Sequence, residues 1–170
     1  MELVNIRQAT KKDALAISEV LILSQWFTYE SLYSTEYIQK LINQYYNVQR
    51  IEQEIVSISN EWHGYFIAEI DGKVLGVIGG GVTADRIGEV YVFYLDPEMR
   101  GKGIGTRLLN FFTKIQKHIY GVTEQRVAVA KGNSYGIPFY EARGFIYQHE
   151  ETAYGGSHED ISLIYRRELV

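Results

Sequence analysis

The sequence predicts a single mixed α/β (α+β) domain covering residues 1–170. Three observations predict it. Apolar residues between positions 12 and 57 recur with the helical period of about 3.6, whereas those from Gly64 onward alternate as they do in strands. Asp71-Gly72 separates two alternating runs and is a strong signal for a tight hairpin turn. A glycine-rich segment around Gly103 then joins a strand to an amphipathic helix, so helices and strands are interleaved.

The first 57 residues are predicted to form one strand and two helices. Residues 3–9 alternate apolar and polar side chains, which suits an opening strand, and Thr10 stands where a helix N-cap would. Apolar side chains then recur on one face over residues 12–28 and again over residues 36–57. We therefore expect two long N-terminal helices.

The remaining residues are predicted to form a meander of strands followed by alternating helices and strands. The 126–130 strand is expected to be buried on both faces, and the last two strands to pair around a loop at 155–158. The expected strands are 65–70, 73–79, 89–95, 126–130, 145–154 and 160–166, and the expected helices are 103–118 and about 133–144.

Composition excludes several classes of protein. The absence of cysteine excludes disulfides and thiolate metal sites, and the four histidines lack metal-ligand spacing, so no metal is expected. No apolar run approaches the ~20 residues that span a membrane, and the N-terminus lacks an apolar signal segment, which predicts a cytoplasmic protein without membrane contact. A net charge of −4 with dispersed Lys and Arg argues against nucleic acid and favours a cationic partner.

The most informative segment is a loop between a predicted strand and a predicted helix. Glycines there let the backbone approach an anion closely, and the helix start adds unpaired N–H donors with partial positive charge. A pyrophosphate group fits such a loop. The residues concerned are Arg100, Gly101, Gly103 and Gly105.

Other phosphate-binding loops do not match. A dinucleotide-binding fingerprint would need glycine or alanine at Thr106, and a P-loop would need Gly-Lys followed by Ser or Thr. The second glycine-rich run, residues 79–81, leads into another predicted strand and not into a helix. We therefore interpret that run as structural.

Arg100-Gly-Lys-Gly103-Ile-Gly105 resembles the Arg/Gln-x-x-Gly-x-Gly/Ala signature of the GNAT superfamily of acyl-CoA-dependent N-acetyltransferases. Residues 133–145 resemble the second motif of that family, Asn-x-x-Ala/Gly-x-x-x-Tyr-x-x-x-Gly-Phe. The order of predicted elements is also similar over nearly the whole chain. Two motifs at the expected separation are far more specific than either alone.

The resemblance implies a mixed, mostly antiparallel sheet of six to seven strands with helices on both faces. Its central strands, around residues 89–95 and 126–130, would run parallel and splay apart. The co-substrate acetyl-CoA would lie between them, because unpaired strand amides can bond its pantetheine as a neighbouring strand would.

The resemblance also implies two catalytic residues. Tyr140 would protonate the departing thiolate of CoA, the alternative being a core ring whose hydroxyl caps a backbone group. Glu89 would accept the proton of the amine through water, the alternative being a solvated carboxylate at a strand end. Simple alternation places Glu89 on one strand face with Tyr91, Phe93 and Leu95, and Glu150 and Glu151 are fallback bases.

The expected cofactor-binding residues surround the pyrophosphate and the thioester. Main-chain donors dominate, although Asn133 is at least as well explained as a helix cap. The residues are Tyr94, Leu95, Arg100, Gly101, Lys102, Gly103, Ile104, Gly105, Thr106 and Asn133.

The expected acceptor site lies between the N-terminal helices and the loop joining the last two strands. Aromatic rings near a carboxylate can hold a cationic amine, although packing in the core or at a dimer contact is the simpler role for most of them. The candidate residues are Trp26, Tyr29, Glu30, Tyr33, Tyr91, Tyr154 and His158.

Three functions remain open at this stage. A covered pocket favours an N-acetyltransferase that acts on a small-molecule amine by direct attack. The alternatives are a protein N-terminal or lysine acetyltransferase and a non-catalytic acyl-CoA-binding sensor, and a homodimer is compatible with each.

Overall fold

The computed structural model describes residues 3–152 and 160–170, which contain seven strands in one sheet. The strands are β1 (Asn5–Gln8), β2 (Tyr65–Ile70), β3 (Lys73–Val82), β4 (Gly88–Leu95), β5 (Glu124–Ala130), β6 (Ile146–Thr152) and β7 (Ile161–Glu168). The helices are α1 (Ala14–Tyr29), α2 (Thr35–Tyr45), α3 (Val48–Val56), α4 (Ile104–His118) and α5 (Gly136–Ala142), with short 3-10 turns η1 (Lys11–Asp13) and η2 (Pro97–Met99). No helix in the described part of the chain is long and apolar enough to cross a membrane.

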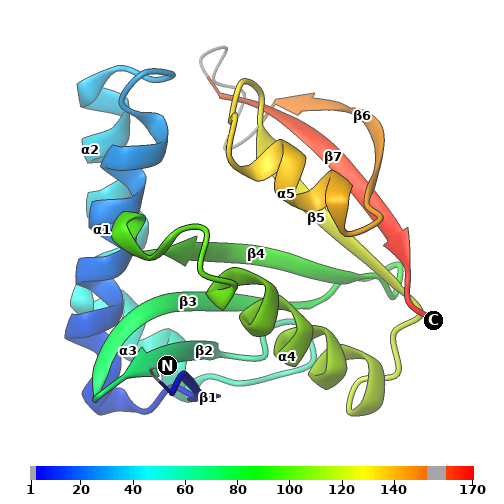
Figure 1. Cartoon of the computed structure of the whole chain (residues 1–170), viewed down its shortest axis with the longest axis horizontal. Coiled ribbons are helices and arrows are strands. Elements are labelled where there is room, and N and C mark those ends of the chain that lie inside the picture. Colours follow the sequence, from blue (N-terminus) through cyan, green and yellow to red (C-terminus); the bar gives the residue numbers. More distant parts are fainter. Residues whose placement is uncertain (1–2, 153–159) are drawn as a thin grey trace.

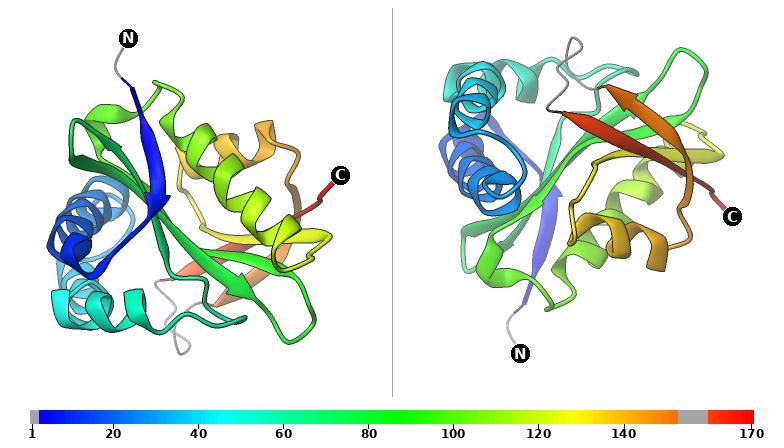
Figure 2. Two further views of the ribbon diagram at one scale, coloured as in Figure 1. Left: turned by 90° about the horizontal axis from the view of Figure 1, so that it is seen from below. Right: turned by 90° about the horizontal axis from the view of Figure 1, so that it is seen from above.

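The strand order is β1-β2-β3-β4-β5-β7-β6, and β4–β5 is the parallel pair in an otherwise antiparallel sheet. Helices α1 to α3 cover one face of the sheet, while α4 and α5 lie on the other (Figure 2). Each face buries its own apolar cluster. The predicted fold class, a mixed and mostly antiparallel sheet with helices on both faces, is confirmed.

The predicted separation of the two central parallel strands is also confirmed. Strands β4 and β5 pair only at their first residues, Gly88 with Gln125, Glu89 with Arg126 and Val90 with Val127. Beyond these pairs the strands diverge (Figure 1). The splay leaves an opening in the middle of the sheet.

Strand β4 contains a bulge at Tyr91. Gly79 pairs with Val92 and Gly80 with Val90, so Tyr91 is an extra residue without a partner on β3. A bulge breaks the alternation of side chains along a strand.

The bulge contradicts one sequence prediction. Simple alternation placed Glu89 on the same face as Phe93 and Leu95, whereas Val90 packs with those two residues in the cluster beneath α4. Glu89 therefore points to the opposite face, toward α1 and α2. Alternation failed because it counts the unpaired residue as an ordinary strand position.

Two further predictions are wrong in detail. The helix expected over residues 36–57 is divided into α2 and α3, because the Asn47 side chain accepts a hydrogen bond of 2.9 Å from the Arg50 amide and starts a new helix. The β5 strand is not buried on both faces, since Ala128 is exposed where the splay opens. The loop expected at 155–158 lies outside the described residues.

The glycine run at 79–81 lies within β3, as its structural interpretation predicted. A Cβ atom at Gly81 would lie 1.8 Å from the carbonyl oxygen of Glu61. We expect Gly81→Ala to lower the free energy of unfolding by about 2 to 4 kcal/mol, because backbone must move to admit the methyl group. Urea unfolding measures this change.

The matched control is Gly72→Ala in the β2–β3 turn. Gly72 has a φ of +78° and no atom within 4 Å of its added Cβ, so only backbone strain opposes alanine there. The expected cost is about 1 kcal/mol. Equal losses in the two variants would show that the contact with Glu61 is not restrictive.

Candidate active site

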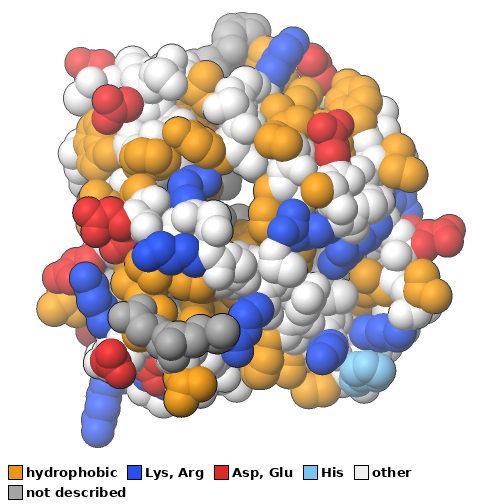
Figure 3. All heavy atoms as spheres, viewed as in Figure 1, with side chains coloured by type: hydrophobic (Ala, Val, Ile, Leu, Met, Phe, Trp, Pro, Cys, Tyr) orange, Lys and Arg blue, Asp and Glu red, His pale blue; other side chains and the backbone are white. Residues whose placement is uncertain are grey.

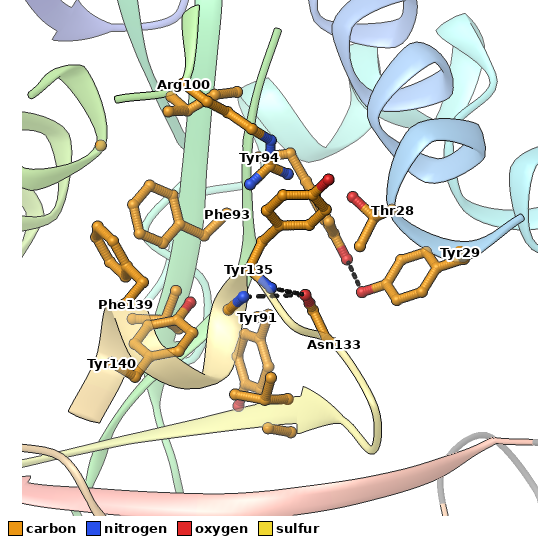
Figure 4. Close-up of a pocket in the computed structure, with 16 residues that line it drawn as sticks. Thr28, Tyr29, Tyr91, Phe93, Tyr94, Arg100, Asn133, Tyr135, Phe139 and Tyr140 are labelled. Atoms are coloured by element: carbon orange, nitrogen blue, oxygen red, sulfur yellow. Dashed lines mark hydrogen bonds between the residues drawn. The ribbon is translucent and has the colours of Figure 1, made fainter. Parts of the chain in front are cut away.

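Two cavities meet where β4 and β5 diverge. The first, the β4–α5 cavity, includes Thr28, Phe93, Arg100, Asn133, Phe139 and Tyr140 in its lining (Figure 4). The second, the β4–α2 cavity, includes Gln25, Tyr33, Leu41, Glu89, Glu151 and Asp160. Both are lined by Tyr29, Val90, Tyr91, Tyr94 and Ala128, which therefore form their junction.

The junction is built by α1 and β4. The hydroxyl groups of Tyr29 and Tyr94 share a hydrogen bond of 2.8 Å. Burial raises the pKa of both phenols, so both stay protonated at neutral pH. Ser24 on α1 donates a 2.7 Å hydrogen bond to the carbonyl of Leu95, which ties the helix to the end of β4.

Tyr140 reaches the β4–α5 cavity from α5. Its ring packs against Phe93, Phe139 and Phe145, and the residue is only 9% exposed. The hydroxyl makes no hydrogen bond to any described residue, so the alternative role as a cap of a backbone group finds no support there. Burial raises the pKa of Tyr140, which keeps its proton available for donation.

Glu89 lies on the other side of the junction, in the β4–α2 cavity. Arg126 on β5 donates to its Oε2 atom from Nη2 at 2.9 Å and from Nε at 3.3 Å. Within the described residues the Oε1 atom has no hydrogen-bond partner. The two predicted catalytic residues thus occupy opposite sides of the junction.

The fallback carboxylates differ in position. Glu151 lines the β4–α2 cavity and contacts His149 at 2.9 Å. Glu150 points away and pairs with Lys131 at 2.8 Å. Of the two, only Glu151 lines a described cavity.

The predicted phosphate loop links η2 to α4. Gly101 and Gly103 have φ angles of +77° and +81°, and Gly103 is the N-cap of α4. A Cβ atom at either position would meet no atom within 4 Å, so positive φ and not crowding requires glycine. The N–H groups of the first turn of α4 have no partner within the helix and can bind an anion.

Arg100 supplies an uncompensated positive charge to the β4–α5 cavity (Figure 4). Its guanidinium carbon lies 4.2 Å from the ring centroid of Tyr135 and 5.2 Å from that of Phe27. The buried Nε atom has no hydrogen-bond partner, and no ion pair of the described residues includes Arg100. Burial lowers its pKa. A cation in this position is suited to an anionic ligand.

Two more observations fit a polar, anionic ligand in the β4–α5 cavity. The Thr28 hydroxyl is buried without a hydrogen-bond partner although the residue lines the cavity. Lys and Arg side chains gather around a hollow in the face that exposes the η2–α4 loop and α5 (Figure 3). This local positive charge contrasts with the net charge of −4 for the whole chain.

The remaining predicted cofactor residues divide between main-chain and side-chain roles. Asn133 accepts hydrogen bonds from the amides of Tyr135 and Gly136, at 3.0 and 2.9 Å, so it caps α5 while lining the cavity. The Ile104 side chain is 2% exposed in the core, which leaves only its backbone to face an anion. The Thr106 hydroxyl accepts a hydrogen bond from Arg143, a residue that the sequence analysis did not select.

The structure brings some predicted acceptor residues together and leaves others apart. Tyr29 and Tyr91 lie at the junction and Tyr33 lines the β4–α2 cavity. Trp26 packs against the apolar cluster around Tyr29, and Glu30 is exposed at the end of α1; neither lines a described cavity. Tyr154 and His158 lie outside the described residues.

Sequence reasoning missed several polar residues of the cavities, among them Gln25, Thr28 and Asp160. Gln25 and Thr28 project from α1, and Asp160 precedes β7. Both are buried although polar, which the sequence does not show because α1 carries other polar residues such as Ser18 and Glu19. Asp160 offered no signal either, since its burial depends on contacts with distant tyrosines.

A family model for the acetyltransferase (GNAT) family matches residues 24–145. The chain belongs to the GNAT family. It is therefore an acyl-CoA-dependent N-acetyltransferase that transfers an acetyl group from acetyl-CoA to an amine.

Full-length relatives agree with this assignment. The GNAT chain is 34% identical over 143 residues to a spermidine N(1)-acetyltransferase of Thermoplasma acidophilum, which covers 84% of this chain and 88% of the relative. The crystal structure of a PaiA N-acetyltransferase of the same organism, in complex with coenzyme A, superposes with a TM-score of 0.84. That match has 31% identity and covers 98% of this chain and 99% of the other.

More distant structures share the fold alone. The ribosomal-protein-S18-alanine N-acetyltransferase of Escherichia coli matches with a TM-score of 0.69 at 15% identity, over 98% of this chain and 94% of that one. Such low identity carries no information about the acceptor.

The phosphate-loop assignment is tested by Gly103→Asp. The substitution places a negative charge where the pyrophosphate of CoA is expected, so we expect the affinity for CoA to fall at least about 10-fold through like-charge repulsion. Isothermal titration measures the dissociation constant. Gly103→Asn is the control. Asparagine has to adopt the same positive φ as aspartate but carries no charge, so it should weaken CoA binding less. Unchanged CoA affinity in Gly103→Asp would contradict the assignment.

Proposed function

We propose that this GNAT enzyme acetylates a primary amine of a small polycation of the spermidine type. The observation that supports the proposal is the charge of the β4–α2 cavity. Glu89, Glu151 and Asp160 line it, and none of its described lining residues is Lys, Arg or His. Arg126 pairs with Glu89, so three carboxylates face one arginine among the described residues, and this excess of negative charge is suited to a ligand with several ammonium groups.

Aromatic rings add to this preference. Tyrosine side chains form much of the wall of the cavity. The face of an aromatic ring attracts an ammonium group, so such a wall suits a cationic ligand. They are Tyr29, Tyr33, Tyr45, Tyr46, Tyr91 and Tyr94. The relative named spermidine N(1)-acetyltransferase, 34% identical over most of both chains, supports the same substrate class.

In the proposed reaction the amine enters from the β4–α2 cavity and meets the thioester at the junction. Glu89 accepts a proton from the ammonium through water, which frees the nitrogen lone pair for attack on the thioester carbon. The C–N bond forms and the C–S bond breaks. Unpaired amides of β4 stabilise the developing oxyanion, and Tyr140 donates its proton to the thiolate that leaves. The nitrogen then loses its second proton, which restores the phenol of Tyr140 and leaves a neutral amide.

Acetyl transfer to a panel of acceptors tests the substrate class. The panel contains polyamines, monoamines, amino acids, aminoglycosides and peptides with free N-termini, and release of free thiol reports turnover. We expect the highest kcat/KM with polyamines. A preference for peptides or for monoamines would contradict the proposal.

A further inference from the structure

Asp160 is a buried carboxylate that has no cationic partner among the described residues. It is 4% exposed, yet it lines the β4–α2 cavity. Tyr33 donates a 2.8 Å hydrogen bond to Oδ1, and Tyr37 donates a 2.7 Å hydrogen bond to Oδ2. No ion pair in residues 3–152 and 160–170 includes it. Two neutral phenols thus hold a charge whose burial is costly.

The carboxylate retains capacity for a ligand. Each oxygen of an ionised carboxylate can accept about two hydrogen bonds, and each oxygen of Asp160 accepts one from a tyrosine. Burial and the charge of Asp160 both raise the pKa of Tyr33, which remains a donor at neutral pH. The tyrosines therefore orient the carboxylate without neutralising it.

Strand register separates Asp160 from the catalytic end of the cavity. Glu89 pairs with Arg126 on β5. Ser162, two residues after Asp160, pairs with Ala130 at the far end of β5. The four-residue step along β5 from Arg126 to Ala130 corresponds to about 13 Å. The charge of Asp160 also contributes to the raised pKa of Tyr94, so its field reaches the junction.

Gln25 is a second buried polar residue of the cavity. It is 2% exposed and lines the same cavity, where its side-chain amide interacts with the hydroxyl of Tyr94. The cavity is thus equipped for a polar molecule along its length.

We propose that Asp160, oriented by Tyr33 and Tyr37, binds a second ammonium group of the acceptor while the reacting amine lies at the junction near Glu89. Two fixed points then select diamines and longer polyamines over monoamines, and favour one spacing between nitrogens. This inference rests on the proposed function and adds the residue that sets the preference.

The test compares α,ω-diamines from diaminopropane to diaminooctane with alkylamines of matched length, in the parent enzyme and in Asp160→Asn. The parent should prefer diamines and show an optimum length. In Asp160→Asn we expect KM for the best diamine to rise about 10- to 100-fold, because a charge-assisted hydrogen bond is lost. Its kcat and the KM for alkylamines should change little. An unchanged diamine KM would overturn the inference.

Asp160→Glu provides an independent variant that keeps the charge. It extends the carboxylate by one methylene, so the preference for diamines should persist while the optimum diamine becomes shorter. Loss of the preference, or an optimum that does not move, would contradict a direct contact with the second ammonium. CoA-induced stabilisation confirms that each variant is folded.

Two controls separate binding from structural and general charge effects. Tyr37→Phe removes one of the two hydrogen bonds that orient Asp160 but keeps its charge, so KM for the best diamine should rise less than in Asp160→Asn while the preference for diamines persists. Glu36→Gln removes an exposed negative charge next to Tyr37 and should leave the ratio of diamine to alkylamine KM unchanged. If the parent acetylates no diamine or polyamine, the proposed function is wrong as well. If the parent prefers them and the diamine KM of Asp160→Asn equals that of the parent, only the present inference is wrong.

Discussion

Tyr140→Phe is expected to lower kcat by ~10²- to 10⁴-fold with little change in stability. The substitution removes the hydroxyl that faces the β4–α5 cavity and keeps the ring that packs against three phenylalanines. Because CoA thiolates leave reasonably well unaided, the lower end of this range is the firmer expectation. The affinity for CoA should remain close to that of the parent.

The structure sharpens the distinction between a catalytic and a packing role. The hydroxyl has no hydrogen bond to a described residue, so its loss should change the free energy of unfolding by less than about 0.5 kcal/mol. Steady-state kinetics and urea unfolding of the same variant measure both quantities. Full activity in Tyr140→Phe would end its assignment as the general acid.

The matched control is Tyr147→Phe. Tyr147 is 48% exposed on β6, and its ring contacts Tyr165 outside both cavities. Removal of that hydroxyl should alter neither kcat nor KM. A comparable loss of activity in this variant would show that the assay responds to general perturbation of the β6–β7 pair.

Glu89→Gln is expected to lower kcat/KM about 10²-fold or more at neutral pH and to recover partly at alkaline pH. Glutamine keeps the shape and an oxygen for Arg126 but cannot accept the proton of the amine. As the pH rises, more of the acceptor is already unprotonated, so the base becomes less necessary. The pH profiles of kcat/KM for parent and variant measure this effect.

Glu151→Gln is the matched comparison for Glu89→Gln, because Glu151 lines the same cavity but its described ion pair is with His149 and not with an arginine. If Glu89 is the base, Glu151→Gln should affect KM more than kcat and leave the shape of the pH profile unchanged. A flat, parent-like rate for Glu89→Gln across pH would reduce Glu89 to a structural partner of Arg126.

Local patterns in the chain predicted the elements that form the cofactor side of the site. Glycines at positions 101 and 103 signalled positive φ, and both have it. The residues at 133–145 placed Tyr140 on a short helix, and the structure agrees. These features could be predicted because turn chemistry and motif spacing act within a few neighbouring residues.

The acceptor side could not be predicted in the same way. The bulge at Tyr91 arises from pairing with β3, and it turned Glu89 to the face opposite the one that alternation had assigned. Trp26 and Gln25 are neighbours on α1, yet one packs in an apolar cluster and the other lines a cavity. Which of them faces an opening depends on how α1 packs against the sheet, which no local pattern specifies.

Sequence alone was sufficient for the family, the order of most elements and the phosphate loop, because each depends on short stretches of backbone chemistry. Tertiary structure decided the rest. It brought Glu89, Glu151 and Asp160 into one cavity whose described lining residues include no Lys or Arg, and it placed Tyr140 in the adjoining β4–α5 cavity. The burial of Asp160 between Tyr33 and Tyr37 joins residues more than 120 positions apart, and contacts over such separations exist only after the chain has folded.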